Sequence, residues 1–77
     1  MEAKMYSTSR CGWCNKVAKM LEKYEINVEK IDVSGDKTLI KEMQKAAGEK
    51  VTSVPQVVVD GKYIGGYTEV ERFLKRI

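Results

Sequence analysis

The stretch Ser9-Arg10-Cys11-Gly12-Trp13-Cys14-Asn15-Lys16 decides the fold, because it holds both cysteines of the chain and marks a change of secondary structure. Residues 3–7 before it have the composition of a short strand. The apolar residues after it recur at helical spacing: Val17, Ala18, Leu21 and Tyr24. We therefore predict a helix from Gly12 to Tyr24. A Cys-x-x-Cys pair between a strand and a helix is typical of a thiol–disulfide redox site.

Cys11 falls at the start of this helix, where its sulfur faces unpaired backbone N–H groups and the positive end of the helix dipole. The thiolate is the attacking species in disulfide exchange, so this position favours Cys11 as the nucleophile. Lowering the pKa of a thiol from about 8.5 to about 6 takes about 3.4 kcal/mol, and the dipole supplies about 0.3–1 kcal/mol, or about 2 at most. We expect the N–H groups of Trp13 and Cys14 and the charge of Arg10 to supply the rest. Cys14 shares the apolar helix face, which predicts a buried, resolving thiol.

Three other interpretations of the cysteine pair fit less well. A zinc site needs two further ligands, and the chain has no histidine and no third cysteine, so we expect no metal. A structural disulfide across so short a loop would stabilise the fold little. Two inert core cysteines suit Cys14, but Cys11 falls at a polar helix start.

The composition is that of one globular domain spanning residues 1–77, with 43% hydrophobic and 32% charged residues and a net charge of +3. Most lysines alternate with glutamates along the expected helices: Lys16, Lys19, Glu22, Lys23, Glu25, Lys37, Lys41, Glu42, Lys45 and Glu49. This alternation indicates solvated helix faces rather than a nucleic-acid stripe. The mild positive field would favour anionic thiols.

The chain has no apolar run of about 18 residues, so we expect no membrane span. The first residues lead directly into the first expected strand, without the pattern of a signal peptide. We therefore expect the protein to work in the cytoplasm. In this reducing compartment a cysteine pair is more often catalytic than structural. We also expect a monomer.

The middle of the chain predicts a second strand and a second helix. Residues 27–33 form the strand, although their apolar positions do not alternate cleanly. Ser34-Gly35-Asp36 caps the following helix, and Gly48 ends it. Its apolar face is expected to consist of Leu39, Ile40, Met43, Ala46 and Ala47. A helix crossing between the first two strands implies that they are parallel.

The last third predicts a hairpin and a final helix. Strands at 57–59 and 62–64 flank the two-residue turn Asp60-Gly61, so they are antiparallel. Thr68-Glu69-Val70-Glu71 fits a capping box. The apolar stripe of this helix is Val70, Phe73, Leu74 and Ile77. The predicted fold is α/β, a four-stranded mixed sheet in the order βαβ-α-ββ-α with helices on both faces.

Two further segments each have both a structural and a functional interpretation. Ser53-Val54-Pro55-Gln56 holds the only proline, which either begins a strand or forms a cis Val54-Pro55 bond whose backbone faces Cys11. Gly65-Gly66-Tyr67-Thr68-Glu69 is either a turn with a helix cap or an anion site at a helix N-terminus.

Together, Cys11-Gly12-Trp13-Cys14, Ser53-Val54-Pro55-Gln56-Val57 and the run from Asp60 to Glu69 resemble a glutaredoxin of the dithiol type, in order and spacing across nearly the whole chain. The resemblance implies a thioredoxin-like fold, a cis proline at Pro55 and glutathione as a reducing co-substrate rather than a permanently bound cofactor. It also implies protein partners that carry disulfides or glutathione adducts, ribonucleotide reductase among them.

The resemblance also assigns roles by position. Cys11 is the nucleophile and Cys14 the resolving cysteine. Val54 would pair its backbone with the cysteinyl unit of glutathione, and Thr68 and Glu69 would receive its γ-glutamyl end. The full expected glutathione site is Thr8, Arg10, Trp13, Ser53, Val54, Pro55, Gly66, Tyr67, Thr68 and Glu69.

The sequence departs from the family pattern at the cysteines. The family's common Cys-Pro-Tyr-Cys is here Cys-Gly-Trp-Cys, and Thr8 stands where the family often has Lys or Arg. Arg10 or Lys16 is expected to supply the missing charge. Two alternative functions stay open: an electron donor reduced by a thioredoxin reductase, and an iron–sulfur carrier in which two chains and glutathione supply the cluster ligands.

Overall fold

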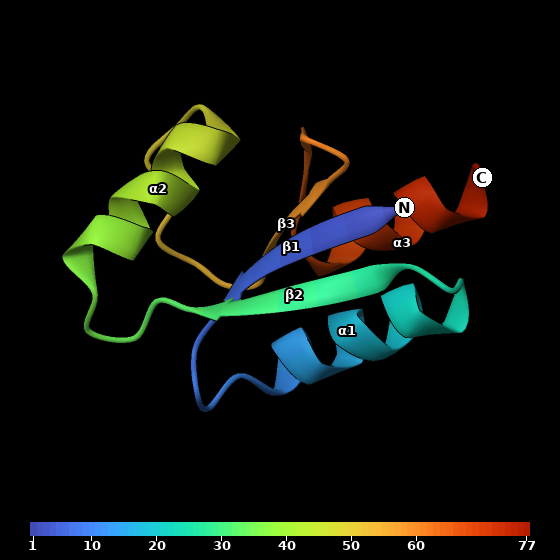
Figure 1. Ribbon diagram of the computed structural model, residues 1–77, viewed down its shortest axis with the longest axis horizontal. Coiled ribbons are helices and arrows are strands. Elements are labelled where there is room, and N and C mark those ends of the chain that lie inside the picture. Colours follow the sequence, from blue (N-terminus) through green and yellow to red (C-terminus); the bar gives the residue numbers. More distant parts are fainter.

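The computed structural model describes all residues from Met1 to Ile77. The elements along the chain are β1 (Glu2–Ser7), α1 (Gly12–Lys23), β2 (Asn27–Asp32), α2 (Lys37–Ala47), β3 (Gln56–Val59), β4 (Lys62–Gly65) and α3 (Tyr67–Lys75). Figure 1 shows these elements in sequence colours. This confirms the predicted order of elements, and the boundaries differ by single residues.

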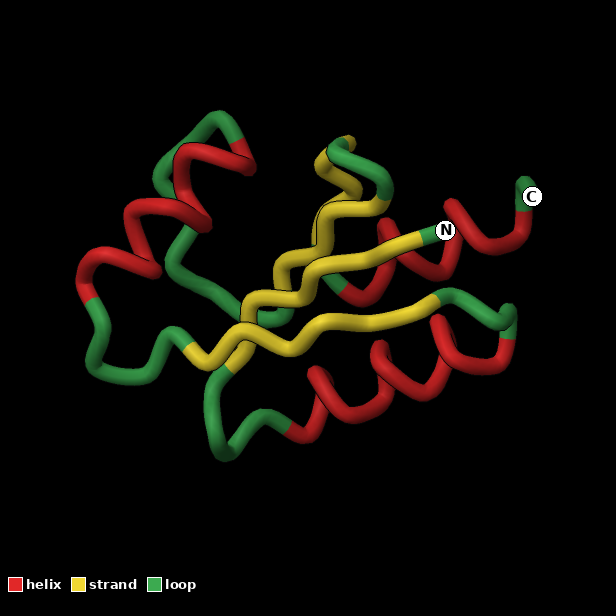
Figure 2. Tube along the Cα trace, viewed as in Figure 1, coloured by secondary structure: helices red, strands yellow, loops and turns green.

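The four strands form one mixed sheet in the order β2-β1-β3-β4 (Figure 2). β1 pairs with β2 in parallel, with Tyr6 opposite Ile31, and pairs with β3 antiparallel. β3 and β4 form the predicted hairpin. Asp60 and Gly61 both have positive φ, 48° and 81°, which is the turn geometry that matches the twist of paired strands.

The helices cover both faces of the sheet. α1 and α3 lie on one face, where they enclose the larger core with Met5 and Val57 at its centre. α2 lies on the other face over a smaller core of Tyr6, Val33 and Met43. Met43 is the only fully buried residue of α2, whereas α1 buries four. The central strand β1 thus carries the larger core on one side and the smaller core on the other.

The helices correct four predictions. Tyr24 is 46% exposed because it is the C-cap of α1, beyond the last packed turn, and Ile77 is 56% exposed because it follows the end of α3. Ala46 is exposed because the hollow that it lines with Tyr6 and Val58, between α2 and the sheet, is open to solvent. The capping interaction of α3 begins at Gly66, not Thr68: the backbone N–H of Gly66 donates to Glu69 Oε1 at 2.9 Å.

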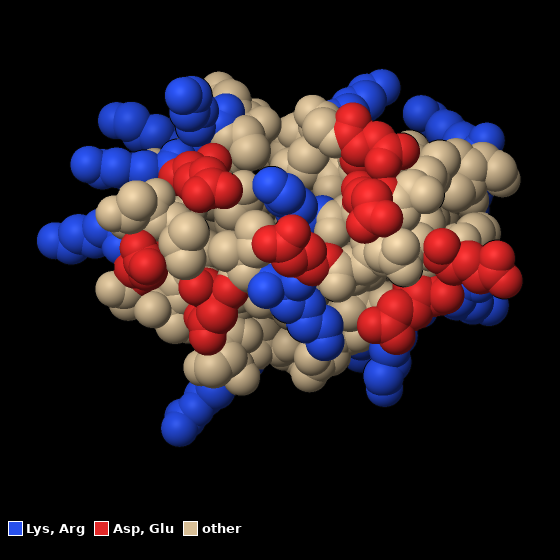
Figure 3. Space-filling model, viewed as in Figure 1, with Lys and Arg blue, Asp and Glu red and all other residues tan.

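Acidic and basic side chains alternate over the face drawn in Figure 3, without a single-sign stripe. The one ion pair of the chain joins Lys75 to Glu71 on α3, and both side chains are largely exposed. None of the helices is long and apolar enough to cross a membrane.

Candidate active site

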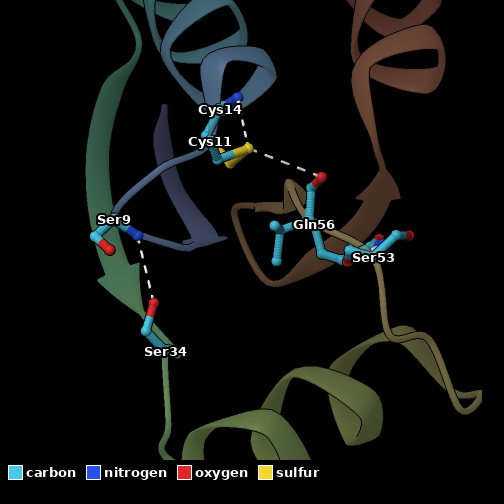
Figure 4. The surroundings of a disulfide bond; sticks show 7 residues. Ser9, Cys11, Cys14, Ser34, Ser53 and Gln56 are labelled. Atoms are coloured by element: carbon cyan, nitrogen blue, oxygen red, sulfur yellow. Dashed lines mark hydrogen bonds between the residues drawn. A yellow bond between two sulfur atoms is a disulfide. The ribbon is translucent and has the colours of Figure 1, made fainter.

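The two cysteines lie where the chain leaves β1 and enters α1, and they form a disulfide (Figure 4). Their Cα atoms are 5.2 Å apart. Cys14 is 2% exposed and belongs to the larger core, whereas Cys11 is half-buried. This confirms the predicted difference in burial: a reagent in solution can reach Cys11 more easily than Cys14.

Cys11 is the N-cap residue of α1, and its sulfur takes the place of the usual capping oxygen. The backbone N–H of Cys14 donates to Cys11 Sγ at 3.1 Å. The first turn of α1 contains no acidic residue that would oppose a negative charge there. In the reduced protein, this N–H group and the helix end favour a thiolate at Cys11.

Trp13 and Arg10, which were also expected to stabilise the Cys11 thiolate, make no direct contact with its sulfur of the kind that Cys14 makes. The N–H group of Trp13 makes no hydrogen bond to the sulfur, so the direct bond comes from Cys14 alone. Arg10 is exposed in the turn before α1 and forms no ion pair. Its predicted effect on Cys11 therefore stays a prediction.

The segment before β3 reaches across to the cysteine pair. The Val54-Pro55 peptide bond is cis, as the resemblance implied. The carbonyl oxygen of Val54 lies 3.9 Å from Cys11 Sγ, so the backbone of this segment faces the nucleophile. An extended peptide attached to Cys11 through a disulfide would therefore lie beside the backbone of Val54.

A cleft of about 370 Å³ opens next to this contact. It brings together seven residues of the predicted glutathione site: Trp13, Ser53, Val54, Pro55, Gly66, Tyr67 and Glu69. Thr8 lines a separate hollow of about 240 Å³ on the α2 side of Val54. Arg10 and Thr68 are exposed and line neither hollow. The roles of all ten residues in binding glutathione stay predictions.

An aromatic contact closes one side of the cleft. The rings of Trp13 and Tyr67 meet edge to face, with centroids 4.9 Å apart and an interplanar angle of 68°. The ammonium of Lys16 lies 4.6 Å from the centroid of the Trp13 ring, a cation–π distance. Trp13 is nevertheless 55% exposed, so most of its surface is open to a bound partner.

Sequence reasoning missed a buried polar network behind the cleft. The amide of Gln56, 5% exposed, accepts the hydroxyl hydrogen of Tyr63 at 2.6 Å. The same amide donates to the carbonyl oxygen of Ser53 at 3.0 Å and to its Oγ at 3.2 Å. Gln56 thus holds β4 and the segment before Pro55 together (Figure 4 shows Gln56 beside Ser53). The available signal was a lone amide opening an otherwise all-valine strand.

The cleft also contains one acidic residue, Glu49, that the sequence did not place there. Glu49, in the loop after α2, lines the cleft together with Glu69 of α3 and Tyr63 of β4. Burial, and then the negative charges of Glu49 and Glu69, raise the pKa of Tyr63 above its ordinary value. Both carboxylates therefore act on the same space.

These features define a protein of the thioredoxin fold with a redox-active cysteine pair at a strand–helix junction. The family model described as glutaredoxin matches residues 3–64. The chain therefore belongs to the glutaredoxin family.

Individual relatives agree with this assignment. Glutaredoxin 1 of Escherichia coli (strain K12) is 28% identical over 80 residues, which cover 97% of this chain and 94% of the relative. The solved structure of reduced Escherichia coli glutaredoxin has a TM-score of 0.83 at 27% identity and covers 99% of this chain and 95% of that one. A buckwheat glutaredoxin solved as a glutathione complex has a TM-score of 0.78 at 22% identity, with 96% and 68% covered, which supports the fold.

Proposed function

We propose that this protein is a glutathione-dependent thiol–disulfide oxidoreductase that works in the cytoplasm. The observation that carries the proposal is the position of Cys11 Sγ, which accepts the Cys14 N–H at 3.1 Å and lies 3.9 Å from the Val54 carbonyl at the edge of the cleft. The first contact favours the attacking thiolate, and the second places peptide backbone beside it.

With a glutathionylated protein, the thiolate of Cys11 attacks the glutathione sulfur of the mixed disulfide. The new bond joins Cys11 to glutathione, and the protein thiolate leaves. A second glutathione then attacks the glutathione sulfur on Cys11, releasing glutathione disulfide and restoring the thiolate. Cys14 takes no part in this sequence, so one cysteine is sufficient.

With a protein disulfide, Cys11 first forms a mixed disulfide with the substrate. Cys14 then attacks Cys11 and expels the second substrate thiolate, which leaves the Cys11–Cys14 disulfide seen in the structure. The short separation of the two Cα atoms, 5.2 Å, permits this step without movement of the backbone. Two glutathione molecules reduce the pair again.

Family membership and the cleft beside Cys11 support glutathione as the reductant. The buckwheat neighbour was solved with glutathione bound, and the cleft here contains seven of the residues expected at such a site. Glutaredoxins have potentials of about −200 to −230 mV, within reach of the glutathione pool, whereas thioredoxin lies near −270 mV.

The test is a coupled assay with NADPH, glutathione reductase and glutathione, run with a glutathionylated peptide and with a protein disulfide. We expect Cys11→Ser to lose both reactions and Cys14→Ser to lose only the second. A Cys14→Ser protein that is inactive on the glutathionylated peptide would overturn the assignment of roles. Turnover with thioredoxin reductase and none with glutathione would overturn the choice of reductant. A coloured, dimeric protein after anaerobic purification with glutathione would instead indicate the iron–sulfur alternative.

A further inference from the structure

The cleft beside Cys11 has an unbalanced charge. Its lining includes two carboxylates, Glu49 and Glu69, but no lysine and no arginine. This is unexpected in a chain whose net charge is +3. The polar groups that remain in the lining are neutral: the Ser53 hydroxyl, the Gln56 amide and the tyrosine hydroxyls.

Basic residues line two neighbouring hollows but not the cleft itself. Lys62, Arg72 and Arg76 line a hollow that shares Tyr63 and Glu69 with the cleft, although none of the three forms an ion pair with Glu69. Lys16, Lys19 and Lys23 line a second hollow along α1 that shares Tyr67 with the cleft but lies outside it. The edge-to-face contact of Trp13 with Tyr67 separates this second hollow from the cleft. A ligand disulfide-bonded to Cys11 and lying against Val54 therefore enters a space whose only charged lining residues are the two glutamates.

Neither carboxylate is neutralised within the protein. Glu69 accepts the backbone N–H of Gly66, which leaves its charge in place, and neither Glu69 nor Glu49 forms an ion pair. Burial is the main cause of the raised pKa of Tyr63, and the charges of Glu49 and Glu69 add to it, so both carboxylates act on this lining residue of the cleft. An anionic group brought into this space is opposed from two sides.

We propose that Glu49 and Glu69 make this site select by charge, favouring thiols and disulfides whose groups next to the sulfur are cationic or amidated over those that carry free carboxylates. The inference rests on the proposed function and refines its substrate class. Glutathione itself has two carboxylates and one ammonium group. Its ammonium group is attracted by the cleft, whereas its glycyl carboxylate is opposed. A glutathione with an amidated glycine, or a cysteine flanked by lysine or arginine in a protein partner, avoids that repulsion.

The experiment compares two mixed disulfides of one reporter peptide, made with glutathione and with its glycine carboxamide. In each, the Cys11 thiolate attacks the tripeptide sulfur and the peptide thiolate leaves, so only the charge at the glycine differs. We expect kcat/KM to be about 1.5- to fivefold higher for the amide, the range of exposed charge pairs. We expect the ratio to fall toward one in 0.5 M salt, because salt screens exposed charges.

Variants identify the source of the preference. Glu49→Gln and Glu69→Gln should each reduce the ratio, and the glutamine at 69 keeps an oxygen that can accept the Gly66 N–H. Glu22→Gln removes the same charge from the exposed face of α1 and should leave the ratio unchanged. Equal use of the two mixed disulfides, preference for free glutathione, or a preference that survives both cleft substitutions would overturn the inference.

A second pair of substrates separates this inference from the proposed function. Reduction of cystamine and of dithiodipropionate, driven by dithiothreitol, needs no glutathione. If glutathione fails as a reductant but the cationic disulfide is still preferred, the proposed function is wrong and the charge selection stands. If glutathione works and the charge of the substrate has no effect, only the charge selection is wrong.

Discussion

Replacing Gln56 with leucine tests whether the polar network behind the cleft positions the substrate-facing backbone. Leucine is close in size to glutamine and keeps β3 apolar, but it removes all three hydrogen bonds of the amide. The hydroxyl of Tyr63 then loses its partner in a half-buried position. Ser53 is exposed, so water replaces its two lost bonds.

The expected loss of stability follows from these contacts. Leaving the Tyr63 hydroxyl without a partner destabilises by about 1–3 kcal/mol, and the Ser53 bonds contribute little because water replaces them. Burial of the leucine side chain offsets about 1 kcal/mol of this loss. The net loss is then about 0–2 kcal/mol, and each kcal/mol lowers the Tm of a domain of this size by about 4–8 °C.

The assay combines denaturant unfolding of the oxidised protein with steady-state kinetics on a glutathionylated peptide. We expect a raised KM with little change in kcat, because the segment carrying Val54 loosens whereas Cys11 and its N–H donor do not. Tyr63→Phe is the matched control: it removes one bond of the network but leaves Gln56 on Ser53, so KM should stay near the wild-type value. Unchanged stability and unchanged KM in Gln56→Leu would refute the reasoning.

Two further predictions concern stability. Gly65→Ala should destabilise by about 1–3 kcal/mol, because φ there is +131° and the new Cβ would lie 2.8 Å from the Glu69 side chain. Gly12→Ala is the control and should be near neutral, because a Cβ there would have no atom within 4 Å. Equal thermal unfolding of the two variants would contradict this prediction. Burial, and then a hydrogen bond to Glu42, raise the pKa of Tyr6 to about 12, so the folded protein keeps this proton when the unfolded chain has lost it. This contribution to stability is present below about pH 10 and is lost as the pH rises from about 10 to about 12, by up to about 3 kcal/mol. In urea unfolding, Tyr6→Phe should lose less stability over this pH range than the wild type. An equal loss in both proteins would exclude Tyr6 as its source.

The sequence alone predicted the parts of the site that depend on local pattern. The strand–helix junction at Cys11, the Asp60-Gly61 turn and the end of α2 at Gly48 each depend on residues a few positions apart. The start of α3 was misplaced because Thr68 and Glu71 match the capping-box pattern, whereas Gly66 has no side chain that could complete it and only Glu69 makes its half of the interaction. Backbone geometry decides between them: Gly66 is extended and Thr68 already helical.

The missed features depend on contacts between distant parts of the chain. Gln56 has its partners on β4 and in the preceding loop, so its own segment does not reveal what it holds. Glu49 belongs in sequence to the lysine–glutamate pattern of an exposed helix, and only the path of the loop after α2 brings it to the cleft. A loop has no hydrophobic periodicity, so the sequence does not predict which way its side chains point.

The unequal packing of the two sheet faces has a consequence for how the molecule fluctuates. α2 is held through Met43 and partly buried neighbours, whereas α1 and α3 share the larger core with β1 and β3. Local opening should therefore require less free energy at α2 than at α1. Amide hydrogens of α2 would exchange with solvent first, while the helix that carries both sulfurs stays closed. The fold thus confines its least stable unit to the face opposite the helix on which the cysteines are anchored.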